Sequence, residues 1–463
     1  METLHSPRWR SYLLLIVAAI GGLMSLGGAL VLFGMGIYAK INSVAEMQPL
    51  NLVLLGWISL VPAIFCVLGV VVAAKELNNR PLSLPKGRGL VLASLGLVVW
   101  ALVAAVFNTV ETSSYAIYAL PPLVLLAASL PLWWYIEYAR FGLSDRQPSR
   151  KWGLASFSFS ITMPAVLLAS SVVLIAVFAA VIVYVYANPD LALQFQHLGM
   201  QLQGADMDPQ VLSAMMERYM QNPLLIAGLL TVIAGLLPLV EELLKTLALW
   251  LYAGDGLTPA EGFVSGLICG GSFALWENLS VLSSVGDGSG TSTLLVRAGT
   301  GLLHVTTAAM IGWSIASAVQ SRGGIWKLVV TYISAALLHC SWNAASIFVG
   351  VGNVINPPTR ELFSANWIST AAFVALGVLM LLNFLILTVF NRKLRPPRPA
   401  YPLYPPAEDQ TLAPAPLAVA AEAPAEQPAS GSADSAAPET QPATEPEPPS
   451  AAQDSPDENH EIA

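Results

Sequence analysis

Long, nearly uninterrupted apolar runs follow one another along most of the chain. Each is long enough for a helix to cross the roughly 30 Å hydrocarbon core of a bilayer. A membrane β-barrel would instead show strands of about ten residues with alternating character. We therefore predict an all-α, polytopic transmembrane helix bundle of about ten spans. The spans are expected near residues 12–38, 50–74, 89–108, 117–137, 160–187, 223–252, 259–282, 294–319, 327–350 and 366–391.

The composition agrees with this pattern. Of 463 residues, 55% are hydrophobic and 11% are charged, whereas a soluble domain carries about 25% charged residues. The first apolar run, Tyr12 to Tyr38, is longer than the core of a signal peptide, so we interpret it as an uncleaved span. The three cysteines lie inside apolar runs and indicate no disulfide framework. Nothing in the charge pattern supports nucleic-acid binding.

Lysines and arginines are distributed unequally between the segments that connect the spans. With the N-terminus inside, the inner segments hold 16 of the 21 and the outer segments hold three. The remaining two, Lys245 and Arg297, fall inside spans. Because cytoplasmic loops carry an excess of basic residues, we predict a multi-pass protein of the cell membrane with both termini cytoplasmic. The charge split favours an even span count, and eight spans is the alternative if one weak segment is re-entrant.

We divide the chain into five regions. Five spans form an N-terminal membrane region at 1–187, and an outer loop at 188–222 includes a predicted amphipathic helix with Asp208 as its N-cap. A membrane core follows at 223–350, then a final span at 351–393. Residues 394–463 are rich in Pro, Ala, Glu and Ser and are expected to form a disordered cytoplasmic tail.

Polar and ionisable residues inside the membrane are concentrated in the sixth to ninth spans. Such groups are expensive in lipid and usually mark a functional site. They are Glu241, Glu242 and Lys245, then Glu277 and Asn278, then Arg297 and His304, then His339 and Asn343.

Helical spacing organises this set. Glu241 and Glu242 lie four and three residues before Lys245, so one helix face carries carboxylates beside an ammonium group. At about 1.5 Å rise per residue, Glu242, His304 and His339 fall near the middle of the bilayer. Glu277 falls nearer the outer side by the same estimate.

Two histidines and several carboxylates in a dry place suit three kinds of role. Imidazole nitrogens and a carboxylate oxygen are a common ligand set for catalytic zinc, with a fourth position left for water. The metal lowers the pKa of that water and a nearby carboxylate takes its proton. The same groups could form a proton relay in a transporter, or act as buried polar contacts that hold the helices together.

Four sequence motifs in this region resemble those of the PrsW family of intramembrane metalloproteases. Residues 241–245 (Glu-Glu-Leu-Leu-Lys) are similar to the family's EExxK motif, and residues 273–278 (Phe-Ala-Leu-Trp-Glu-Asn) to its FxxxEN motif. His304 stands where the family has a lone histidine, and residues 339–343 (His-Cys-Ser-Trp-Asn) resemble its final HxxxN motif. Each motif alone is weak, but their order, spacing and placement in the spans agree.

The resemblance implies proteolysis within the membrane by a metal-activated water. It implies His304 and His339 as metal ligands, with Glu277 as the third. The related CAAX prenyl endopeptidases have histidine at the position of Glu277, so a glutamate of the first motif is the alternative third ligand.

The resemblance also suggests roles for the remaining polar groups. Glu241 or Glu242 would be the general base, and Lys245 would neutralise the pair because two adjacent carboxylates in lipid do not both stay ionised cheaply. Asn343 would stabilise the oxyanion or orient a ligand.

The partners that follow are the lipid bilayer and a membrane protein substrate, such as an anti-sigma factor in a regulatory cleavage. Zinc is the expected cofactor, and iron or another divalent ion also suits such a ligand set. The alternative functions are a proton-coupled transporter and a non-catalytic membrane scaffold. A transporter needs a continuous polar path, whereas this sequence shows one central polar cluster.

Overall fold

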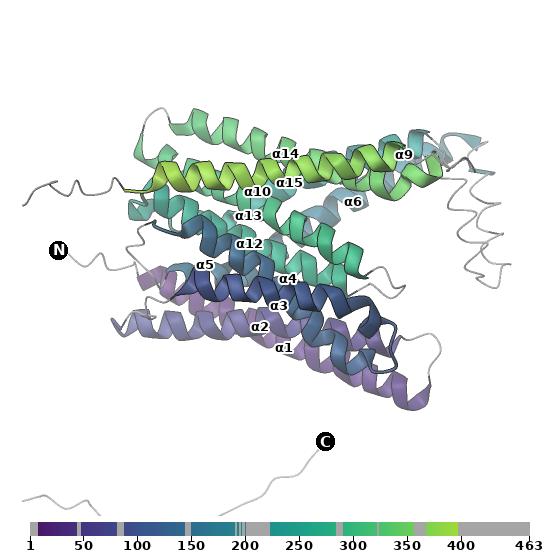
Figure 1. Ribbon diagram of the computed structural model, residues 1–463, viewed down its shortest axis with the longest axis horizontal. Coiled ribbons are helices and arrows are strands. Elements are labelled where there is room, and N and C mark those ends of the chain that lie inside the picture. The colour runs from purple at the N-terminus through teal and green to yellow at the C-terminus, as the bar shows by residue number, and fades with distance from the viewer. Residues whose placement is uncertain are drawn as a thin grey trace, which may run out of the picture. The chain divides into compact units, whose positions relative to one another are not determined.

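The protein is described here by a computed structural model that covers residues 8–43, 48–80, 88–143, 150–189, 223–283, 290–321, 324–355 and 367–396, with a few isolated positions between 192 and 200. Over these residues the regular structure is helical and contains no β-strand (Figure 1). The predicted amphipathic helix of the outer loop and the predicted disordered tail lie outside the described residues. The all-α prediction is confirmed.

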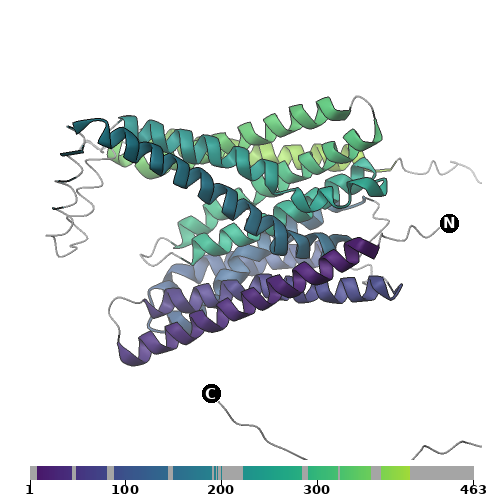
Figure 2. The same cartoon turned by 180° about the vertical axis from the view of Figure 1, so that it is seen from behind.

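The first four spans are single helices, and the fifth is continuous but changes its winding. The first four are α1 (Arg8–Asn42), α2 (Pro49–Leu77), α3 (Gly89–Glu111) and α4 (Ala116–Arg140). The fifth consists of α5 (Arg150–Phe157), the π-helical η1 (Ser158–Thr162) and α6 (Met163–Tyr186). Helices α1 and α2 lie side by side in both views of the molecule (Figures 1 and 2).

The later spans begin with an irregular one. It consists of α9 (Pro223–Leu229), the π-helical η2 (Leu230–Leu236), α10 (Leu237–Leu244) and α11 (Leu247–Trp250). The short 3-10 turn η3 (Ala253–Asp255) then leads to four long helices. These are α12 (Pro259–Leu282), α13 (Gly290–Gln320), α14 (Gly324–Ile355) and α15 (Trp367–Leu394).

The prediction of a polytopic helical bundle is confirmed. Among the described residues, nine helical segments are long and apolar enough to cross a membrane. The remaining predicted span, the seventh at 259–282, corresponds to α12, which carries Glu261, Glu277 and Asn278 and is not among these nine. Most side chains of α12 are buried against other helices, so it has little need for an apolar surface toward lipid.

Local sequence explains where α12 begins and how closely it packs. Thr258 is its N-cap and forms a capping box with Glu261, while Pro259 occupies the first turn. Further along, Gly262, Gly266 and Gly270 face α13, and a Cβ atom at any of them would overlap backbone atoms of α13. The glycines therefore allow the two helices to approach closely.

The sixth span departs from regular α-helix next to its charged residues. The π-helical turn of η2 is followed by Pro238, and a turn at Lys245 and Thr246 separates α10 from α11. Side chains of α14 support this span: the Tyr332 hydroxyl donates to the carbonyl oxygen of Leu239 at 2.8 Å. π-Helical turns such as the one in η2 are frequent at functional sites.

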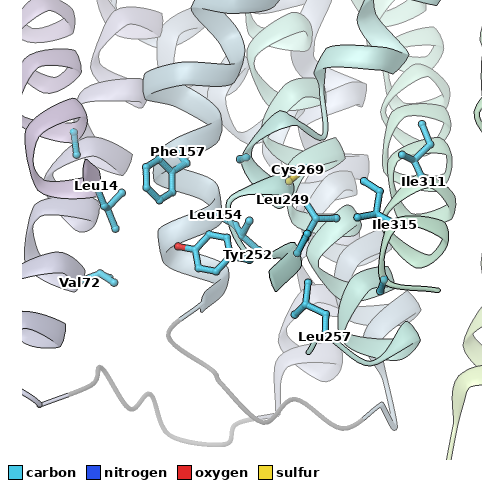
Figure 3. Close-up of a cluster of buried hydrophobic side chains, with 14 of the residues drawn as sticks. Leu14, Val72, Leu154, Phe157, Leu249, Tyr252, Leu257, Cys269, Ile311 and Ile315 are labelled. Atoms are coloured by element: carbon cyan, nitrogen blue, oxygen red, sulfur yellow. The ribbon is translucent and has the colours of Figure 1, made fainter. Parts of the chain in front are cut away.

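A buried apolar cluster joins the early spans to the later ones (Figure 3). Leu14 of α1 and Phe157 of α5 belong to the same cluster as Leu249 of α11, Leu257 before α12 and Ile315 of α13. Burying such side chains is worth roughly 1.5–3 kcal/mol each against water. Within lipid, where this hydrophobic gain is absent, the close packing of these side chains is their main contribution to stability.

Polar contacts reinforce this connection. The Arg10 guanidinium of α1 pairs with both carboxylate oxygens of Asp255 in η3 and lies 5.1 Å from the centre of the Tyr252 ring. At the other end of the bundle, Glu111 of α3 accepts a hydrogen bond from the backbone N–H of Gly290 at 3.2 Å. That N–H is one of the unsatisfied groups at the start of α13, so α3 caps the helix that carries His304.

Candidate functional site

Three buried side chains from three different spans meet in the interior of the later helices. Glu242 of α10, His304 of α13 and His339 of α14 each offer a ligand atom, and these atoms lie within 4.8 Å of one another. All three side chains are almost completely shielded. The structure thus brings together residues that the sequence placed at similar depths in separate spans.

The two oxygens of Glu242 differ sharply in their surroundings. Oε1 contacts three groups: Nδ1 of His339 at 3.0 Å, the hydroxyl of Thr307 at 3.2 Å, and the ammonium group of Lys245. Oε2 is buried and has no hydrogen-bond partner in the described part of the chain. One oxygen is therefore held by the protein and the other is free to bind a ligand.

His304 is completely buried. Its ring centre lies 4.8 Å from that of His339, with the two ring planes at 88°, and 4.7 Å from that of Phe273. Neither of its ring nitrogens makes a hydrogen bond of acceptable geometry with any described residue. Nε2 nevertheless lies only 2.6 Å from Oε2 of Glu277, so the two groups face one another without a well-formed hydrogen bond.

Glu277 is held from its other side by Arg297. Oε1 of Glu277 lies 3.0 Å from Nη2 of Arg297, and Nε of Arg297 donates to Oδ1 of Asn278 at 2.9 Å. Arg297 thus contacts both polar residues of the FxxxEN motif. The sequence analysis placed Arg297 inside the membrane but did not predict this contact.

Glu241 completes the group of carboxylates. Its Oε2 lies 3.6 Å from Nε2 of His339. The side chains of Glu241 and Glu277 are 20% and 34% exposed, whereas those of Glu242 and His339 are 0% and 3% exposed. The site is therefore open on the side of Glu241 and Glu277 and closed around Glu242.

Asn343 lies one turn beyond His339 but contacts the irregular span. Its Nδ2 donates to the carbonyl oxygen of Ile233 in η2 at 3.1 Å. In this arrangement the amide stabilises the π-helical turn. Its predicted contact with an oxyanion stays a prediction.

The residues present fit a divalent metal ion. Oε2 of Glu242 and Nδ1 of His304 are buried and have no hydrogen-bond partner among the described residues, and Oε2 of Glu277 and Nε2 of His304 face one another without a well-formed hydrogen bond. An unsatisfied buried polar group costs about 1–3 kcal/mol, and a cation would satisfy several of these at once. Imidazole nitrogens and carboxylate oxygens are the ligands that catalytic zinc and related ions take.

Fold and site together define a polytopic helical membrane protein with a buried histidine–carboxylate centre. Residues 163–380 match the sequence model of the PrsW family intramembrane metalloproteases. No curated protein matches the chain. No solved structure matches it either.

The family match confirms the resemblance carried by the four motifs. It covers every residue of the site and extends from the first residue of α6 into α15. The family's activity is intramembrane proteolysis, which implies a lipid environment and a membrane protein as substrate. Thr307 was missed by the sequence analysis, because a threonine in a membrane helix is usually bonded to its own backbone.

Proposed function

We propose that this protein is a zinc-dependent intramembrane endopeptidase that hydrolyses a peptide bond of a membrane protein substrate. One observation carries the proposal: the buried convergence of Glu242, His304 and His339, with ligand atoms within 4.8 Å of one another. Ionisable groups placed this deeply are costly in a membrane, and a bound divalent ion accounts for their burial.

His304 and His339 would hold the ion together with one carboxylate. Glu277 was the expected third ligand, and the geometry favours Glu242, whose free Oε2 belongs to the compact group. When bound, zinc would supply an activated water and polarise the substrate carbonyl.

The chain's own groups have distinct tasks in this proposal. Glu241 is partly exposed and lies next to His339, which suits a general base that accepts a proton from water. Lys245 pairs with Glu242 and offsets one negative charge in a region where charge is poorly solvated. Asn343 would have to release the carbonyl oxygen of Ile233 before it could bind an oxyanion.

The substrate class follows from the membrane setting. A peptide bond reaches the site only within the bilayer, so the substrate is a membrane-anchored protein. A regulatory cleavage, such as that of an anti-sigma factor, is the specific case that the family resemblance suggests.

We also place both termini in the cytoplasm, on the basis of the lysine and arginine distribution. Reporter fusions at each terminus, active on only one side of the membrane, would test this orientation.

Metal content is the first test of the site. The full-length protein would be purified in detergent and its metals measured by elemental analysis, beside the variants His304→Ala, His339→Ala, Glu242→Gln and Glu277→Gln. Near-stoichiometric zinc in the wild type, lost in both histidine variants, is expected. Whichever glutamate variant loses zinc identifies the third ligand. His197→Ala, a histidine predicted to lie outside the spans, is the control and should keep its metal.

Proteolysis requires a separate assay. The protein would be reconstituted into liposomes with a panel of tagged single-span membrane proteins, and cleavage products would be identified by mass spectrometry. Cleavage by the wild type and its absence in His339→Ala would support the proposal. Equal cleavage by both would contradict it.

A further inference from the structure

Thr307 connects two spans at the site. It lies on α13, one turn after His304, and its side chain is completely buried. Its hydroxyl contacts the ammonium group of Lys245 and lies 3.2 Å from Oε1 of Glu242. Both of these residues belong to the sixth span, 62 and 65 positions away in the chain.

The hydroxyl can satisfy these contacts together. A threonine hydroxyl donates one hydrogen bond and accepts up to two. It accepts from Lys245, and it donates either to Oε1 of Glu242 or to the carbonyl oxygen of Leu303, which lies 3.0 Å away in its own helix. The contact with Lys245 is therefore available in both orientations of the hydroxyl proton.

The contact fixes the orientation of the Glu242 carboxylate. Lys245 donates to Oε1 of Glu242 and to Thr307, so the threonine limits where the ammonium group can lie. His339 holds the same oxygen from α14. With Oε1 held on three sides, Oε2 is left without a protein partner among the described residues.

We propose that Thr307 is a positioning residue, whose hydroxyl holds the Glu242–Lys245 pair in the orientation that leaves Oε2 of Glu242 for a divalent metal ion. This inference rests on the proposed function and extends it, because it names a residue outside the four motifs. Groups that orient metal ligands typically change metal affinity by 10–100-fold when they are replaced.

The chain offers a matched control beside it. Thr306 is also completely buried on α13, but its hydroxyl donates to the carbonyl oxygen of Leu302 at 2.7 Å, within its own helix. Replacing either threonine by valine keeps the shape and removes the hydroxyl. Only the Thr307 hydroxyl reaches the sixth span.

The test measures zinc affinity by competition with a chromophoric chelator, on the full-length protein in detergent. Thr307→Val should bind zinc roughly 10–100-fold more weakly than the wild type. The zinc affinity of Thr307→Ser, which keeps the hydroxyl, should stay within about threefold of the wild-type value. The affinity of Thr306→Val should equal that of the wild type. Thermal unfolding of each metal-free variant would establish that it is folded.

Several outcomes would overturn the inference. If folded Thr307→Val binds zinc as tightly as the wild type, the positioning role of Thr307 is wrong. The proposed function would still stand. A loss of affinity in folded Thr307→Ser, or an equal loss in Thr306→Val, would show that the hydroxyl contact is not the cause. If Thr307→Val does not fold, Thr307→Ala serves as the variant without a hydroxyl. Absence of zinc binding by the wild type would contradict the proposed function and this inference together.

Discussion

Nδ1 of His339 lies 3.0 Å from Oε1 of Glu242, although the two residues are 97 positions apart in the chain. A histidine that donates from Nδ1 to a carboxylate keeps the lone pair of Nε2 available. Carboxylate–histidine pairs of this kind orient metal-binding imidazoles in many enzymes. The pair therefore links the first and last motifs of the site through one hydrogen bond.

Removing the charge of Lys245 should destabilise the protein. Lys245→Met leaves the buried carboxylate of Glu242 without its cation, and breaking a buried pair in this way typically costs about 3–5 kcal/mol. The free energy of unfolding, measured by denaturation in mixed micelles, would show the loss. The double variant Glu242→Gln/Lys245→Met should recover part of it, because no unpaired charge of that pair remains. Equal stability of the wild type and Lys245→Met would contradict the pairing.

Replacing Arg297 should reduce proteolysis without removing a metal ligand. Arg297→Gln takes the positive charge from Glu277 and the guanidinium donor from Asn278. We expect a fall in cleavage rate of about 10–100-fold, as for other groups that orient a metal site. Lys327→Gln, at an exposed position at the start of α14, is the control for loss of a positive charge. The prediction fails if the two variants cleave a common substrate at the same rate.

A side chain at Gly270 should separate α12 from α13. The added Cβ atom of Gly270→Ala would overlap the backbone carbonyl of His304, and overpacking of this kind costs about 1–3 kcal/mol. Thermal unfolding should therefore occur at a lower temperature. Gly228→Ala is the comparison, because a Cβ atom there meets nothing within 4 Å. That variant should be as stable as the wild type or slightly more stable, and destabilisation of both variants alike would remove the packing explanation.

The pair formed by Arg10 and Asp255 should anchor the first span to the later helices. Arg10→Gln leaves the carboxylate of Asp255 without its bidentate partner. We expect the free energy of unfolding to fall by about 1–3 kcal/mol. Arg8→Gln, at an exposed position in the same turn of α1, should have no measurable effect. Denaturation curves for the two variants would decide, and coincident curves would count against an anchoring role.

Most of the fold could be predicted from hydrophobicity, because in lipid a helix is the structure that satisfies its own backbone. The span containing Glu277 was also predicted, because the run at 259–282 is long and largely apolar despite its two glutamates. The π-helical turn of η2 was not foreseen. Its apolar residues show the same hydrophobic character whether the backbone winds as an α-helix or a π-helix.

The site was partly predictable from the positions of its residues along their helices. Counting depth along each helix placed Glu242, His304 and His339 together, as the structure has them. The same count placed Glu277 too far out, yet it lies 2.6 Å from His304. Depth along an axis takes no account of the tilt of a helix or the point at which two helices cross. The contact of Thr307 with Glu242 and Lys245 depends on how α10 and α13 pack against each other. A single sequence does not indicate that packing.

The cap that α3 places on the start of α13 bears on where this protein can be divided. The family match begins at residue 163, but the N–H of Gly290 is bonded to Glu111, and Asp255 is paired with Arg10. A chain begun at residue 163 would lose both partners and one side of the apolar cluster around Leu249. The boundary of the family match is therefore not a boundary for folding, and we expect the later spans to need the early ones as a scaffold.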